Sequence, residues 1–192
     1  VDKGLKPLVG AFEHETYCSG LDGLTERASD YYARGARFAK WRAVLQITED
    51  GPSDLAIREN AWGLARYARS VQEAGLVPII EPEILMDGNH DILTTSRIQE
   101  RIIKEVYFAC QQNGVYLEGT LLKPSMTVPG ADSGTKSDPK DVALATITTL
   151  LRSVPAAVPG IVFLSGGLSE EEASLYLNEM NILSVDKPWN VS

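Results

Sequence analysis

Hydrophobic and polar positions follow two alternating patterns along this chain. Short apolar runs rich in β-forming residues predict strands at 38–47, 76–83, 115–123 and 160–165. Between them, the stretches 53–74 and 91–112 place apolar residues on one helical stripe and predict helices. Strands that alternate with helices indicate parallel β–α units, so the pattern predicts an α/β fold.

Signals at the helix ends support this division of the chain. Asp138 followed by Pro139 is typical of an N-cap with proline at the first helical position. Ser169 with Glu172 three residues later predicts a capping box. Glycines at positions 75 and 114 stand where two of the helices should end and the next strands begin.

The spacing of polar residues at the strand ends distinguishes between α/β architectures. Lys40, Glu81, Lys123 and Ser165 are separated by 41, 42 and 42 residues, and each lies at or near the carboxyl end of its strand. A (β/α)8 TIM barrel collects its active site there from several strands. An open doubly wound sheet also binds ligands there but usually carries a glycine-rich phosphate loop, and neither GxGxxG nor GxxxxGK[ST] occurs. The barrel is therefore favoured.

Two cations and two acids occupy neighbouring strand ends in the same pattern. Lys40 and Arg42 are two residues apart, as are Glu81 and Glu83, so each pair points to one face of its strand. The cations predict an anion pocket, and the carboxylates predict acid–base chemistry or a metal site. The alternatives are a solvated edge for the cations and a salt-bridged structural pair for the acids.

Lys123 closes an apolar strand and is the candidate nucleophile. A lysine amine attacks a carbonyl only when it is neutral, and burial beside other cations favours that form. The alternative is an ordinary surface charge. Downstream, the segment 163–167 runs from a strand into a capped helix and places Ser165 and Gly166 where barrels bind phosphate. Its alternative is a simple tight turn.

Composition narrows the classes of partner. The 192 residues fit one domain over 1–192, and the net charge of −8 argues against nonspecific binding to nucleic acid or anionic membranes. No apolar run approaches the roughly 20 residues that span a bilayer. His14 and His90 lack ligand spacing, so no metal is expected, and Cys18 and Cys110 are interpreted as free thiols.

Six segments resemble one family, the class I (Schiff-base) fructose-1,6-bisphosphate aldolases. They follow the family's order over essentially the whole chain, and their motifs are specific to it. The segments are GLDGL (20–24), FAKWR (38–42), VPIIEPEIL (77–85), LEGTLLKP (117–124), FLSGG (163–167) and SEEEA (169–173).

The resemblance implies a glycolytic lyase that cleaves fructose 1,6-bisphosphate to dihydroxyacetone phosphate and glyceraldehyde 3-phosphate without metal or cofactor. It implies a homotetramer in the cytoplasm or the chloroplast stroma. It also implies roles for eight residues. These are Lys123 as the Schiff-base lysine, Glu81 as acid and base, Lys40 in bond cleavage, Arg42 at one phosphate, Ser165 and the Gly166 amide at the other, Glu83 in the charge network, and Lys3 along the site.

The chain departs from the family pattern at both ends. A strand-borne aspartate near the family's N-terminus and a phosphate-binding arginine on its last barrel strand have no counterpart here. We therefore expect an incomplete barrel, with two strands missing before residue 1 and one after residue 192. Residues 1–3 should end one strand and 189–192 approach another, around an open arc of parallel strands. The 192 residues alone should be inactive.

Two other functions remain open at this point. One is another Schiff-base sugar-phosphate aldolase, such as a transaldolase-like barrel, which would need only one phosphate site. The other is a non-catalytic scaffold or binding protein that kept the fold. The scaffold reading predicts loss of the lysine or the acid, whereas Lys123 and Glu81 are both present.

Overall fold

The computed structural model describes residues 1–183 and 185–192. Its elements alternate between strand and helix from residue 24 onward. In chain order they are β1 (Leu5–Pro7), β2 (Thr16–Cys18), α1 (Leu24–Ala33), β3 (Phe38–Leu45), α2 (Asp54–Glu73), β4 (Val77–Ile84), α3 (Ile92–Gln112), the 3-10 helix η1 (Leu117–Gly119), β5 (Leu121–Leu122), α4 (Pro139–Ser153), β6 (Gly160–Ile161), α5 (Glu170–Ile182) and β7 (Asn190–Val191).

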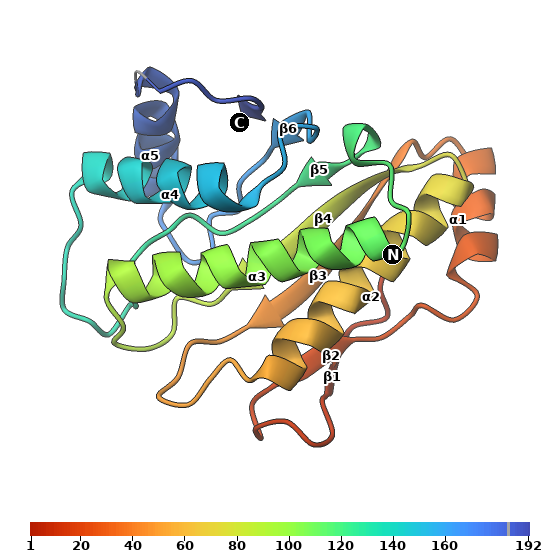
Figure 1. Ribbon diagram of the computed structural model, residues 1–192, viewed down its shortest axis with the longest axis horizontal. Coiled ribbons are helices and arrows are strands. Elements are labelled where there is room, and N and C mark those ends of the chain that lie inside the picture. The colour runs from red at the N-terminus through yellow and green to blue at the C-terminus, as the bar shows by residue number, and fades with distance from the viewer. Residues whose placement is uncertain (184) are drawn as a thin grey trace.

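The main sheet is parallel and follows the order of the chain. Its strands pair β3-β4-β5-β6-β7, and the described strands do not close into a ring. Helices α2, α3, α4 and α5 each contact the next, and Figure 1 shows α2 and α3 lying along β3 and β4. The predicted α/β class and the open arc of parallel strands are confirmed. Ahead of this sheet, β1 and β2 form an antiparallel hairpin.

The two faces of β3 differ because side chains alternate along a strand. Ala39 and Trp41 are buried toward the helices, whereas Lys40 and Arg42 on the other face are half-buried. Trp41 stacks on Tyr67 of α2, with 5.3 Å between ring centroids, and the Tyr67 hydroxyl donates to the Ala39 carbonyl. Apolar packing therefore holds the helices behind the sheet and leaves the opposite face to the charged residues.

The helix ends follow the predicted local signals. Ser53 and Asp91 cap α2 and α3, and Asp138 caps α4 ahead of Pro139. Ser169 forms the predicted capping box at α5. The glycines at 75 and 114 have φ angles of 83° and 64°, a left-handed conformation that suits the residue after a helix.

The strand predicted at 115–123 is wrong over most of its length. Residues Leu117–Gly119 form η1, and only Leu121–Leu122 pair in the sheet. Gln72 of α2 explains the difference, because its amide accepts from the Tyr116 N–H at 3.0 Å and donates to the Tyr116 carbonyl at 2.8 Å. A side chain far away in sequence therefore satisfies backbone groups that a strand would have paired.

Two other predicted strands also need correction. The ladder at 160–165 covers only Gly160–Ile161, although Val162 still donates to the Leu122 carbonyl at 2.9 Å. Residues 1–3 form no strand. The next residue, Gly4, has a φ of 90°, which is outside the range of extended backbone. The Val1 ammonium instead donates to the Lys40 carbonyl at 3.3 Å. The sequence predicted the approach to a strand at 189–192, and the structure has the strand β7 there.

Candidate active site

Three of the predicted residues meet across neighbouring strands, although the expected position at the strand end is wrong for Lys40, the third residue of β3. In the β3–β4 register Arg42 lies opposite Glu81, and the Lys123 N–H donates to the Ile80 carbonyl at 2.7 Å, which extends the β4–β5 pairing. The Glu81 carboxylate therefore lies between two ammonium groups. Lys40 Nζ is 3.1 Å from Oε2, and Lys123 Nζ is 3.1 Å from Oε1.

The burial of these groups is unequal. The Glu81 side chain is 4% exposed, the Lys123 side chain 27% and the Lys40 side chain 43%. A buried carboxylate needs compensating partners, which the two lysines supply. The Lys123 contact is an aligned hydrogen bond, whereas Oε2 makes none with the described residues and meets Lys40 through charge alone. Oε2 is thus a buried acceptor that no described residue satisfies by a hydrogen bond.

A second ion pair lies beside the first on the same face. Arg42 Nε donates to Oε2 of Glu83, a carboxylate that is 9% exposed. This hydrogen bond raises the pKa of the Arg42 guanidinium above its ordinary value and outweighs burial, which lowers it. One edge of the guanidinium is thereby fixed, and the rest of its N–H groups are free to face an anion.

The remaining candidates lie further from this cluster. Ser165 is exposed, and Gly166 and Gly167 have φ angles of 61° and 104°, so the chain turns there into the capped start of α5. Lys3 is exposed, and its backbone N–H donates to the Ser19 carbonyl. No hydrogen bond or ion pair within the described part of the chain joins Ser165, Gly166 or Lys3 to Glu81.

Behind Lys123 lies a set of buried polar side chains that sequence reasoning missed. Ser125 Oγ accepts from the Ile84 N–H at 2.9 Å and donates to the Ile84 carbonyl at 3.0 Å. Gln99 Nε2 donates to the Ser125 carbonyl at 2.6 Å, and Gln99 Oε1 accepts from the Thr127 hydroxyl at 2.5 Å. The sequence offered one signal for this network. Gln99 lies on the buried face of a predicted helix, and a buried glutamine needs hydrogen-bond partners in the core.

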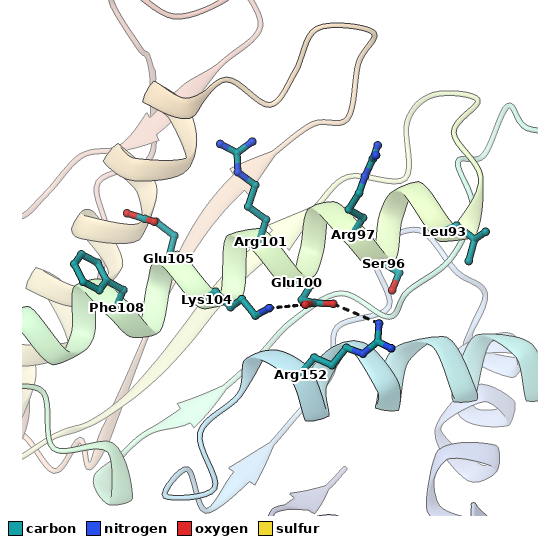
Figure 2. A pocket seen from close by; sticks show the side chains of 9 residues that line it. All are labelled: Leu93, Ser96, Arg97, Glu100, Arg101, Lys104, Glu105, Phe108 and Arg152. Carbon is teal, nitrogen blue, oxygen red and sulfur yellow. Dashed lines mark hydrogen bonds and ion pairs between the residues drawn. The ribbon is translucent and has the colours of Figure 1, made fainter.

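A sizeable hollow lies elsewhere, on the helix layer between α3 and α4. It measures about 740 Å³, and Figure 2 shows Glu100 between Lys104 and Arg152, with ion pairs to both. Arg101 pairs with Asp54 of α2. None of the eight candidate site residues, all of which the structure describes, lines this hollow. The candidate chemistry thus belongs to the sheet and not to this hollow.

The structure was also searched for groups of metal ligands. Among residues 1–183 and 185–192, no three His, Cys, Asp or Glu side chains gather closely enough to hold a metal ion. His90 stands alone in the turn before α3, where burial lowers the pKa of its imidazole. A carboxylate between two lysines can instead move protons next to an amine nucleophile.

Comparisons with known proteins agree on one family. The family model described as fructose-bisphosphate aldolase class-I matches residues 1–192. The chain is 57% identical to chloroplastic fructose-bisphosphate aldolase 2 of Arabidopsis thaliana and 56% identical to its cytosolic aldolase 4, in each case over the whole chain. These matches cover 47% and 49% of the two relatives, so the chain spans about half the length of the curated relatives it matches.

A solved structure supports the same assignment. The chain superposes with a TM-score of 0.97 and 51% identity on fructose-bisphosphate aldolase from Plasmodium falciparum, crystallised with TRAP and a small-molecule inhibitor. The match covers the whole chain and 55% of that structure. The predicted fold, a (β/α)8 barrel of which these residues form part, is therefore confirmed. The chain belongs to the class I fructose-bisphosphate aldolase family.

Proposed function

We propose that this chain carries the Schiff-base site of a fructose-bisphosphate aldolase. The reaction is the reversible cleavage of fructose 1,6-bisphosphate to dihydroxyacetone phosphate and glyceraldehyde 3-phosphate. The observation that carries the proposal is the buried Glu81 carboxylate held 3.1 Å from each of Lys40 and Lys123. Membership of the class I aldolase family supports the proposal. The geometry supports it separately, because imine formation needs a lysine amine beside an acid.

In the proposed mechanism the Glu81 carboxylate first takes a proton from the Lys123 ammonium that it binds, and the neutral amine then attacks the substrate ketone and forms a carbinolamine. Glu81 donates the proton that lets the hydroxyl leave as water, which gives a protonated imine. When the bond between the α and β carbons of the imine breaks, its electron pair moves toward the imine and forms an enamine, while the hydroxyl on the departing β carbon loses its proton and becomes the aldehyde. Protonation of the enamine and hydrolysis of the imine release the second product and restore Lys123.

The other residues are proposed to bind and orient the sugar bisphosphate. Arg42, held by Glu83, would bind one phosphate, and Ser165 with the Gly166 amide would bind the other at the turn into α5. Lys40 would assist bond cleavage from its place beside Glu81. Lys3 would line the site as a mobile cation, since its side chain is exposed.

Trapping with borohydride tests the proposed nucleophile. Reduction of the full-length protein in the presence of substrate should attach a triose phosphate to Lys123, as read by peptide mass mapping. Lys123→Ala should lose both label and activity, whereas Lys104→Ala, a matched change on the exposed surface of α3, should keep both. Label on a different lysine, or none, would refute the assignment.

We further propose a homotetramer and a single domain over residues 1–192. The buried apolar residues form one contiguous cluster from Cys18 to Trp189, which supports a single domain. Native mass spectrometry should give four copies of the chain, and a monomer at micromolar concentration would contradict the tetramer. The named relatives are chloroplastic or cytosolic, so we propose one of these compartments. Within the described residues no helix is long and apolar enough to span a bilayer.

A further inference from the structure

The segment that carries Lys123 has little backbone pairing of its own. Strand β5 contributes only Leu121 and Leu122 to the ladder with β4, and the Lys123 N–H adds one bond to the Ile80 carbonyl. Further along β4, Pro82 has no N–H to donate. Regular strand pairing therefore does not fix the backbone after Lys123 against the strand that carries Glu81.

Side chains replace the missing ladder. Ser125 Oγ binds both backbone groups of Ile84, the last residue of β4, at 2.9 and 3.0 Å. Gln99 of α3 holds the Ser125 carbonyl at 2.6 Å. Ser125 is 5% exposed and Gln99 2%, so these bonds are shielded from competing water.

The anchoring extends one residue further into the helix layer. Thr127 donates its hydroxyl to Gln99 Oε1, and its backbone N–H donates to Thr146 Oγ1 of α4 at 2.9 Å. Both amide groups of Gln99 are thereby used, and the residue cannot rotate without losing two buried bonds. The segment after Lys123 is thus tied to β4, α3 and α4 through buried polar side chains.

We propose that Ser125 and Gln99 are positioning residues for the aldolase reaction, which rests on the function proposed above. The Lys123 N–H already holds its backbone to Ile80, and Ser125, which Gln99 holds in place, adds the anchor at Ile84 on the other side of the lysine. The amine is therefore held at hydrogen-bond distance from the acid before substrate arrives. Neither residue contacts Glu81, so each acts through the placement of Lys123.

Kinetics of four variants of the full-length protein test this proposal. Ser125→Ala and Gln99→Met should lower kcat about 10- to 100-fold, because small displacements of a reacting group cost that much. The KM for fructose 1,6-bisphosphate should stay within about twofold, since no phosphate contact changes. Ser125→Thr keeps the hydroxyl and should restore most of kcat. Ser153→Ala removes a similarly buried hydroxyl that binds the Thr149 carbonyl on α4, and should leave kcat unchanged.

The rate of borohydride trapping separates positioning from plain stability. It should fall in Ser125→Ala and Gln99→Met in proportion to kcat, at a temperature where calorimetry shows both folded. Folded variants with wild-type kcat and trapping rate would overturn the proposal. Should Ser125→Ala fail to fold, Gln99→Met decides, because methionine keeps the side-chain length. If the wild-type protein itself carries no label on Lys123, the proposed function fails instead.

Discussion

At the scale of single residues, the organising feature is one carboxylate shared by two ammonium groups. Glu81 is 4% exposed and would be costly to bury as an anion without partners. Lys40 and Lys123 each contact a different oxygen of the same group. Each lysine therefore helps to orient the carboxylate for its contact with the other lysine. Removal of any one of the three groups changes the surroundings of the other two.

Replacement of Glu81 by glutamine tests its proposed role as the proton donor. Glu81→Gln keeps the shape but cannot give up or take a proton, so we expect turnover to slow roughly 10²- to 10⁴-fold. The Lys123 adduct should still form, only more slowly, and stopped-flow kinetics with borohydride quenching measures both. The control is Glu59→Gln on the exposed face of α2, which should behave as wild type. An unimpaired Glu81→Gln would assign the proton transfers to another group.

The cysteines give a prediction about pH. Burial raises the pKa of the Cys18 thiol from its ordinary value of 9.0 to about 11, and that of Cys110 to about 12. The folded state thus holds these protons more tightly than the unfolded chain. Their contribution to stability is full below about pH 9 and is lost as the pH rises through 11.

At pH 8, both thiols should therefore resist alkylation in the native protein and react quickly in denaturant. A time course of iodoacetamide labelling with and without guanidinium checks this, and denaturation at pH 7 and 10 should show lower stability at the higher pH. Rapid labelling of Cys18 in the native state would mean that the thiol is far more accessible than its 7% exposure indicates.

At the scale of elements, the parallel register decides which groups meet. Strand β3 presents Lys40 and Arg42 two residues apart, and β4 presents Glu81 and Glu83 with the same spacing. Each cation then forms its ion pair diagonally, with the acid two positions beyond its register partner on β4. The arrangement follows from strand periodicity and does not depend on long loops.

Two serine caps provide a matched test of element stability. Ser53 caps α2 and also donates to the buried Glu15 carboxylate at 2.6 Å, whereas Ser169 caps α5 on an exposed surface. Ser53→Ala should lower the free energy of unfolding by about 2 kcal/mol or more, because it also weakens a buried charge's hydrogen bonding. Ser169→Ala should cost about 1 kcal/mol. Urea denaturation measures both losses of stability. Equal losses would show that the hydrogen bond from Ser53 to Glu15 adds no stability of its own.

Elements were predictable where their determinants are local. Caps such as Ser53 and Asp138 act within three residues, and a helix start can be placed from them alone. The strand at 115–123 failed because Gln72, 44 residues before Tyr116, decides its backbone pairing. β-rich composition describes a preference for extended backbone, and a tertiary hydrogen bond can outweigh it.

At the scale of the whole molecule, the helices cover one face of the sheet and the charged side chains lie on the other. This division explains which parts of the site could be predicted. Lys40, Glu81 and Lys123 were predictable as a group because their spacing of 41 and 42 residues places them on successive parallel strands. Ser125 and Gln99 were not, since nothing in their local sequence indicates that the β4–β5 ladder will end before Ile84.

A prediction for the whole protein concerns metal ions. Catalysis should survive dialysis against a strong chelator without loss, because the proposed electron sink is the protonated imine of Lys123. Cleavage of fructose 1,6-bisphosphate before and after chelation measures it, with a metal-dependent aldolase treated in parallel as the control. Loss of activity that zinc restores would support a metal-centred mechanism instead.

The short ladder at β5 has a consequence for how motion near the nucleophile can be observed. The Ile84 amide hydrogen is held by a side-chain hydroxyl and not by another backbone group. Its exchange with deuterated solvent therefore reports the opening of that one bond, whereas neighbouring amides in β4 report opening of the sheet. A labelled Ile84 signal would make it possible to follow, during turnover, whether the lysine-bearing segment loosens when product leaves.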